Sequence, residues 1–244
     1  MPSLIVLLPL ASPSPPSEAE LAYALVSDSG MLTRQGQAGI AHLPPASELI
    51  VQVPAQMLSW QQVDLPKPGR AIPSAKLRAV LGGLLEDQVL DDPSQLHFAL
   101  PAQAPGGEKT WVAVCQKTWL AAWLQQLEAQ GRLASRIVPQ AEPSASLQLH
   151  ISGSPETAQF IAASAQGVLC APLSQLHVLL PDLPADAPVS AEPAVAAQAQ
   201  HALGEERSIQ VLQNTQYATR SLGSDWNLGQ FDLSTAGRDR LVQQ

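Results

Sequence analysis

The sequence predicts a mixed α/β fold made of many short strands and two clear helices. Short apolar runs bounded by proline or glycine, such as residues 4–8 and 22–26, are typical of buried strands. Apolar residues recur at helical spacing over 77–89 and 118–130, which predicts two amphipathic helices. The 22 prolines and a charged fraction of only 14% favour short elements joined by rigid turns.

Length and charge narrow the class of protein. A chain of 244 residues with 45% hydrophobic residues can bury a substantial core. Its net charge is −8, and its 13 Lys and Arg residues are scattered, so nucleic acid is not an expected partner. The two cysteines, Cys115 and Cys170, lie in separate apolar runs and are expected to be free thiols in a reducing compartment. No apolar run has the length of a membrane span, and the N-terminus does not resemble a signal peptide.

The first third of the chain is expected to be strand-rich. A tight turn at Asp28-Ser-Gly30 separates the second strand from the third. The predicted strands are 4–8, 22–26, 31–37, 48–53 and 58–63.

The middle third is expected to form a compact α+β unit with the order helix, strand, strand, helix, strand. Pro73 suits the first turn of its first helix, and Gly131 suits the end of its second. Pro105-Gly-Gly107 is expected to turn the chain between the two central strands. The predicted strands are 96–100, 111–115 and 136–138.

The last third is expected to begin with a strand over 147–151 and a hairpin over 157–170. A Pro/Asp/Ala-rich loop over 181–193 is predicted to be exposed, followed by a helix over 194–203 and a strand over 209–212. No internal repeat with a fixed period is apparent.

Catalytic and metal signatures are sparse. None of the five histidines has a second His or Cys at ligand spacing, so no metal site is predicted. There is no GxSxG motif, and only a Ser or Cys beside His150 could support a hydrolase. Neither phosphate-binding motif, GxxxxGK[ST] or GxGxxG, is present.

Segment 76–100 contains a distinctive series of stretches, Lys76-Leu-Arg78, Leu84-Leu-Glu-Asp-Gln88, Asp92 and Leu96-His-Phe-Ala-Leu100. This series resembles the cytoplasmic part of type II secretion system protein L. Further matches follow in the right order at Val112-Ala-Val114, Trp119–Leu127 and Ile137-Val-Pro139. Trp226-Asn-Leu228 with Gln230 and Phe231 resembles the family's WNL-x-Q-G-x-[FY] end motif, shortened by a missing Gly.

The resemblance, which spans about residues 4–233, implies an actin-like, ribonuclease H-like core of two halves with an inserted α+β subdomain. Residues 1–65 would form the first half and 66–138 the insert. Residues 139–233 would form the second half, and 234–244 would be a juxtamembrane tail in which Arg238 and Arg240 suit a cytoplasmic flank.

In an actin-like fold, two loops would be the expected phosphate-binding positions. Actin-like ATPases cradle phosphate with an Asp-x-Gly hairpin after the first core strand and with a second loop, expected here near 150–156. The Pro/Ser-rich loop over 11–17 has no such signature, and Ile151-Ser-Gly-Ser-Pro155 has the Gly without the Asp. Asp28-Ser-Gly30 is favoured as an ordinary hairpin turn. The resemblance therefore implies no cofactor and no catalytic residue.

The function implied by the resemblance is a non-enzymatic scaffold at the cytoplasmic face of the bacterial inner membrane. Expected partners are the amino-terminal domain of the secretion ATPase (protein E), protein M and a second copy of the chain. The membrane would be reached only through a transmembrane helix outside these 244 residues. The alternatives are an actin-like nucleotide-binding protein similar to the type IV pilus assembly protein M, with Asp28 positioning a metal, and a small-molecule hydrolase.

The candidate partner-binding residues are acidic. They gather at the end of the first predicted helix, where carboxylates oppose the helix dipole and could meet a basic partner surface. These residues are Glu86, Asp87, Asp91 and Asp92.

Overall fold

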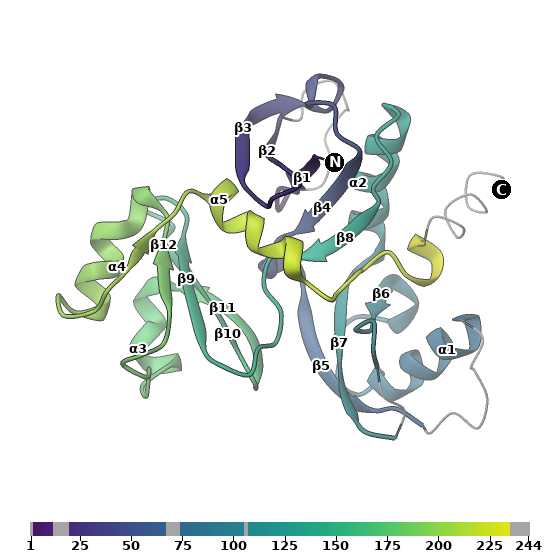
Figure 1. Ribbon diagram of the computed structural model, residues 1–244. Coiled ribbons are helices and arrows are strands. Elements are labelled where there is room, and N and C mark those ends of the chain that lie inside the picture. The colour runs from purple at the N-terminus through teal and green to yellow at the C-terminus, as the bar shows by residue number, and fades with distance from the viewer. Residues whose placement is uncertain (1, 12–19, 67–73, 105–106, 235–244) are drawn as a thin grey trace.

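The computed structural model describes residues 2–11, 20–66, 74–104 and 107–234. In Figure 1 the first half of the chain lies at the top, the second half at the left and the inserted unit at the lower right. Predictions that concern Pro73, the turn at 105–106, most of the 11–17 loop, Arg238 and Arg240 fall outside the described residues.

The first half contains a five-stranded sheet of order β3-β2-β1-β4-β8. Strands β1, β2 and β3 are antiparallel neighbours, whereas β4 pairs in parallel with both β1 and β8. Their bounds are β1 Ser3–Leu7, β2 Glu20–Val26, β3 Leu32–Gly39, β4 Glu48–Val53 and β8 Arg136–Pro139.

The second half repeats this arrangement with the order β11-β10-β9-β12-β13. The first three strands of this half are again antiparallel neighbours, and the last two join in parallel. Their bounds are β9 Gln148–Ser152, β10 Gln159–Ser164, β11 Gly167–Pro172, β12 Val189–Ala191 and β13 Gln210–Val211. The two halves thus share strand order and direction, although the sequence shows no repeat.

A helix connects the last two strands of each sheet, as a parallel crossover requires. In the first half this helix is α2 (Lys117–Ala129), whose buried face carries Trp119, Leu120, Trp123, Leu124 and Leu127. In the second half it is α4 (Ala196–Leu203), which follows the short helix α3 (Leu176–Leu179).

The inserted unit is a three-stranded antiparallel sheet covered by one helix. The sheet has the order β5-β7-β6, with β5 Ser59–Asp64, β6 Leu96–Ala99 and β7 Lys109–Gln116. Alternating side chains divide its faces: Phe98, Val112 and Val114 pack with α1 (Ser74–Leu85), whereas Ala99, Ala113 and Cys115 join the core formed with α2.

The sheet pairings differ from the predicted limits of the insert, 66–138, at both ends. Over this range the chain forms α1, β6, β7, α2 and β8 in that order. However, β5 precedes this range and pairs with β7, whereas β8 ends the range and pairs with β4 of the first sheet. We therefore propose that the insert comprises β5 to β7 and that α2 and β8 belong to the first half.

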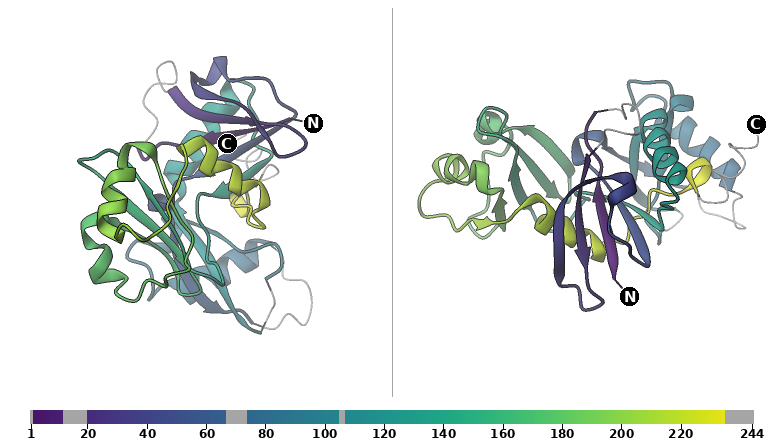
Figure 2. Two further views of the ribbon diagram at one scale, coloured as in Figure 1. Left: turned by 60° about the vertical axis from the view of Figure 1, so that its left-hand side comes forward. Right: turned by 90° about the horizontal axis from the view of Figure 1, so that it is seen from above.

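After the second half the chain returns to the first. Helix α5 (Asn214–Ala218) lies against β1, β2 and β3. The short turn of helix Thr219–Gly223 follows it, and its Ser221 hydroxyl accepts a hydrogen bond from Gln52 of β4. Ala218 and Leu222 pack there with Ile5, Ala24 and Val138. The yellow segment in Figures 1 and 2 shows this course from the second half, across the first, to the insert.

One predicted loop is in part a buried strand. Residues 181–193 were expected to be exposed, but β12 lies within this range between β9 and β13, with all three residues buried. The surroundings of Val189, Ser190 and Ala191 come from strands distant in sequence, so the local proline-rich composition was a poor guide.

Candidate functional site

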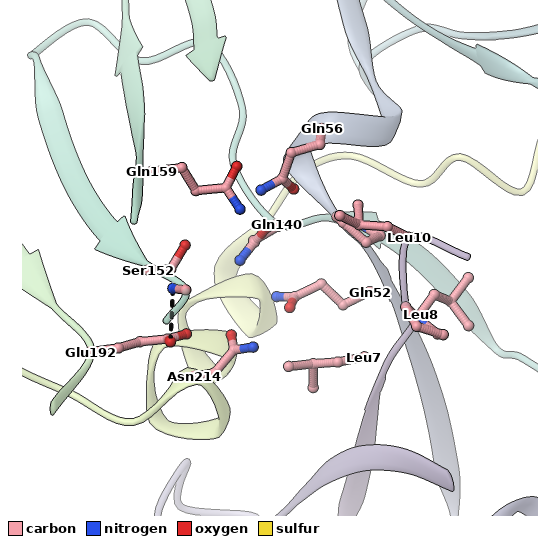
Figure 3. A pocket seen from close by; sticks show the side chains of 13 residues that line it. Leu7, Leu8, Leu10, Gln52, Gln56, Gln140, Ser152, Gln159, Glu192 and Asn214 are labelled. Carbon is pink, nitrogen blue, oxygen red and sulfur yellow. Dashed lines mark hydrogen bonds between the residues drawn. The ribbon is translucent and has the colours of Figure 1, made fainter. Parts of the chain in front are cut away.

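A cleft separates the two five-stranded sheets at the carboxyl ends of their central strands, which is where open α/β sheets bind ligands. It is a hollow of about 260 Å³. Leu7 and Leu8 enter it from the end of β1, Gln52 from β4, Gly153 from the turn after β9, and Glu192 from just after β12 (Figure 3).

The turn after β9 stands where the second phosphate loop was expected. Gly153 has a φ of +107°, and an added Cβ would lie 2.7 Å from the carbonyl oxygen of Thr157, so only glycine fits. The Gly153 N–H donates a hydrogen bond of 3.2 Å to Glu192 Oε2, drawn as the dashed line in Figure 3. A carboxylate of this chain thus occupies a backbone donor that a phosphate would need.

Amide side chains dominate the rest of the cleft. Gln140 accepts a 3.0 Å hydrogen bond from the Ala55 N–H, and Gln52 donates to the Ser221 hydroxyl. Among the described residues that line the cleft, none is Lys, Arg or His, and the one ionisable group is Glu192. Burial raises the pKa of this glutamate, and the Gly153 N–H opposes that shift.

Asp28 lies far from this cleft. It is exposed in the turn between β2 and β3, where the Gly30 N–H donates to the Ser27 carbonyl at 2.9 Å. Because Leu7 pairs with Ala22 and Ser3 with Val26, this turn is at the opposite end of the sheet from Leu7. The alternative in which Asp28 positions a metal in the cleft is therefore contradicted by the register.

His150 does have a serine neighbour. Its Nδ1 lies 3.0 Å from Ser190 Oγ, and its ring stacks on Tyr217 at 3.7 Å between centroids. His150 and Ser190 are 1% and 2% exposed, so a substrate has no access to the hydroxyl. Burial lowers the pKa of His150 to about 3, which removes its strength as a base. The pair thus lacks the exposure and basicity of a hydrolase site.

The predicted acidic residues follow α1, which ends at Leu85, and all four are exposed. Asp91 accepts a 2.7 Å hydrogen bond from Gln116 Nε2. Asp92 accepts one of 2.8 Å from the Ser94 N–H, which lowers its pKa. Asp91 also lines a hollow beneath Leu90, whereas Glu86, Asp87 and Asp92 do not. We call these four residues the acidic corner.

The end motif fastens the last described segment to two parts of the fold. The side chain of Gln230 accepts from the Leu100 N–H at 3.2 Å and donates to the Leu100 carbonyl at 2.7 Å. His97 Nε2 lies 2.6 Å from the Leu228 carbonyl oxygen. These contacts hold residues 226–234, which we call the C-terminal strap, against β6 of the insert.

The same strap also pairs with the first half. The Leu228 N–H donates to the Ile137 carbonyl at 2.6 Å, and Asn227 Oδ1 accepts from the Ile137 N–H at 3.1 Å. Lys117 Nζ, at the start of α2, lies 2.6 Å from Asp232 Oδ2. The strap therefore ties the insert to the first half.

Phe231 explains the apparent shortening of the motif. Its φ is +52°, a left-handed conformation that glycine adopts without penalty. It stands directly after Gln230, where the family pattern has Gly. We propose that the motif is not shortened and that Phe231 stands at the position of its Gly, in a backbone conformation that glycine adopts readily; its ring packs against the core of the insert.

The described residues contain no group of three or more His, Cys, Asp or Glu side chains that could hold a metal ion. In the same part of the chain, no helix is both long and apolar enough to cross a membrane.

The two free cysteines have raised pKa values because of burial, about 12 for Cys115 and about 11 for Cys170.

Comparison with known families identifies the class of protein. Residues 22–152, more than half of the chain, match the family described as "Type II secretion system (T2SS), protein L". This chain belongs to the protein L family.

Relatives in the family agree with this assignment. The type II secretion system protein L of Dickeya chrysanthemi is 35% identical over 115 residues, which cover 47% of this chain and 27% of that protein. Its counterpart from Pectobacterium carotovorum subsp. carotovorum is 30% identical over 148 residues, covering 57% and 32%. The match thus spans about a third of these relatives or less.

Solved structures place this protein L chain in the actin-like class of folds. The cytoplasmic domain of EpsL, an inner-membrane component of the type II secretion system of Vibrio cholerae, superimposes with a TM-score of 0.66 at 21% identity, covering 96% of this chain and all of that one. A chain of the PilM–PilN type IV pilus biogenesis complex has a TM-score of 0.55 at 10% identity, covering 88% and 89%. The predicted fold class is confirmed.

Sequence reasoning missed two residues of the cleft. Glu192 follows β12, a strand that was not expected, so its position at the sheet edge could not be foreseen. Gln56 lies in the short helical turn Ala55–Met57, which was not predicted either. A search for strand ends on the second half, guided by the strand order of the first half, could have located Glu192.

Proposed function

We propose that this member of the protein L family is a non-enzymatic scaffold that recruits the secretion ATPase to the inner membrane. Its surfaces bind partner proteins, and its cleft holds no nucleotide. Protein M of the same system is the proposed second partner. The cytoplasmic face of the inner membrane is the proposed location.

The observation that carries this proposal is the chemistry of the cleft. A triphosphate needs backbone N–H groups, cationic side chains or a carboxylate-held metal ion to neutralise its charge. Here the Gly153 N–H already binds Glu192, and the described lining offers no cation. An ionised Glu192 at this position repels phosphate, which favours docking over nucleotide chemistry.

Titration calorimetry with ATP and magnesium tests the absence of nucleotide binding. We expect no heat of binding for the wild-type chain. Micromolar binding would instead support the alternative, an actin-like nucleotide-binding protein similar to the type IV pilus assembly protein M.

The acidic corner is the proposed contact for a basic surface of the ATPase. All four carboxylates are exposed, and complementary charge accelerates and orients association. A pull-down with the amino-terminal domain of the ATPase would compare wild type with the charge reversals Glu86→Lys, Asp87→Lys, Asp91→Lys and Asp92→Lys. Unchanged binding by the fourfold variant would remove this face from the proposal and leave recruitment itself standing.

A further inference from the structure

Three hollows of the surface meet at one side chain. Gln56 lines the cleft of about 260 Å³, a hollow of about 720 Å³ beside β11 and α4, and a third of about 410 Å³ beneath Leu90. Gln159 is shared by the first two. Because β5 lies in contact with β11, the hollows run from the cleft between the halves to the insert (Figure 1).

Gln56 has an unused acceptor at this junction. Its Oε1 is buried and has no hydrogen-bond partner within the described chain, a state that costs free energy unless a donor arrives. Figure 3 shows the amide groups of Gln56, Gln140 and Gln159 turned toward one another around the cleft. Side-chain amides carry both a donor and an acceptor, which is what an extended peptide backbone requires of its partner.

The charge of the lining selects the ligand. Each hollow carries one carboxylate, from Glu192, Glu156 and Asp91 respectively, and the described lining residues include no Lys, Arg or His. An anion is disfavoured throughout, whereas a Lys or Arg side chain finds a complementary charge in every hollow.

Apolar contacts complete the surface. Leu90 is fully exposed, at 106% of its reference area, and lines the third hollow together with Met57 and Leu58. The second hollow is lined by Ala171, Leu173 and Ala202. A partner's apolar side chain that covered Leu90 would remove apolar surface from water, which favours association.

We infer that the three hollows joined at Gln56 form one docking groove for an extended segment of a partner protein that alternates basic with apolar side chains. The inference rests on the proposed scaffold function and names the chemistry of the partner. An extended segment is favoured over a helix because its free backbone N–H and C=O groups can bond to the side-chain amides that line the hollows, whereas a helix already satisfies its own backbone groups.

Calorimetry with two matched peptides tests the groove. The probes are a short amidated peptide of repeated lysine–leucine pairs and its glutamate–leucine counterpart. We expect the basic peptide to bind at least about tenfold more tightly than the acidic one. We expect Gln56→Trp, whose larger side chain fills the junction, to bind the basic peptide about tenfold more weakly than wild type. Equal affinity for both peptides, or unchanged binding by Gln56→Trp, would overturn the inference.

Two double variants guard against a folding defect in Gln56→Trp. Asp91→Lys with Glu156→Lys reverses two exposed charges of the groove, and we expect this double variant to bind the basic peptide about tenfold more weakly than wild type. The matched control, Glu205→Lys with Glu206→Lys, reverses two exposed charges that line no part of the groove and lie outside the acidic corner. An equal loss in both double variants would show general charge attraction and contradict a specific groove.

The binding of the ATPase domain and the binding of the basic peptide together distinguish this inference from the proposed function. If the amino-terminal domain of the ATPase binds and the basic peptide does not, recruitment is supported and the groove is contradicted. If the peptide binds in the groove and the ATPase domain does not bind at all, recruitment is contradicted and the groove is supported. Sedimentation that shows wild-type dimers and a monomeric Gln56→Trp would make a second copy the occupant, which would contradict a partner segment.

Discussion

Single side chains of this fold carry out tasks that differ from those their residue types suggest. His150 and His97 are buried neutral groups, not ligands or bases, and burial lowers their pKa values to about 3 and about 4. Glu192 satisfies a glycine N–H inside the molecule. In each case the surroundings of the residue, and not its chemical type, decide its role.

The two histidines predict a pH dependence of stability. Their folded pKa values lie below the ordinary histidine value of 6.5, so the unfolded chain binds protons that the folded chain does not. Their contribution is therefore complete above pH 6.5 and is lost as the pH falls toward about 4 and about 3.

Replacing His150 tests this directly. His150→Phe should reduce the slope of unfolding free energy against pH in this window by up to about 1.4 kcal/mol per pH unit, the value for one proton. Urea unfolding at several pH values measures the slope. The exposed His201→Gln is the control and should leave it unchanged. Identical slopes for His150→Phe and wild type would refute the assignment.

Gly153 supplies a second residue-scale prediction. Gly153→Ala places a Cβ 2.7 Å from the Thr157 carbonyl at a φ of +107°, so we expect a loss of about 2 kcal/mol or more in unfolding free energy. The control is Gly223→Ala, since a Cβ at Gly223 meets no atom within 4 Å and its φ is ordinary. A loss no greater than in that control would contradict the geometry.

At the scale of elements, the C-terminal strap is the feature whose role the sequence signals without explaining. Its motif is visible in the residues, but its contacts join positions about 90 to 130 residues apart, such as Asn227 with Ile137 and Gln230 with Leu100. Only the folded chain brings them together. The strap bonds to β6 on one side and β8 on the other, so it fixes the insert on the first half.

Gln230→Ala tests the strap. It removes the hydrogen bonds to both backbone groups of Leu100 and to the Asn227 carbonyl, and we expect a loss of about 1–3 kcal/mol. Amide hydrogen exchange should rise in β6 and the strap and stay unchanged in β9 and β10. Gln88→Ala, which loses one bond to the Leu84 carbonyl in the last turn of α1, is the control. Equal exchange in β6 and β9 would mean that the strap does not hold the insert.

Elements with a strong local pattern were predicted well. Strands β1, β2, β4 and β7 and helix α2 were expected within two residues of their observed ends, because apolar runs and periodicity specify them. Strand β12 and helix α5 were missed. β12 has three residues buried by its neighbours β9 and β13, and α5 is stabilised by packing on β1 and β2. Such short elements owe their structure to tertiary contacts.

The candidate sites show the same division. The absence of phosphate motifs and the acidic corner could be deduced from the sequence, because both depend on residue types. The groove at Gln56 could not, since its three hollows combine residues from the first half, the insert and the second half.

For the whole molecule, the duplicated sheet topology sets the frame for function. Two sheets of the same strand order face each other across a cleft, and the chain crosses between them at Gln140–Leu147 and again before α5. In this protein L chain the cleft carries amides and a carboxylate, which suits contacts with a polypeptide and opposes a polyphosphate.

The most direct test of the account is a calorimetric titration of this chain with the amino-terminal domain of its secretion ATPase, done with and without ATP and magnesium. A scaffold with a nucleotide-free cleft predicts micromolar or tighter binding that is the same in both conditions. Absence of binding, or binding that appears only when ATP and magnesium are present, would contradict it.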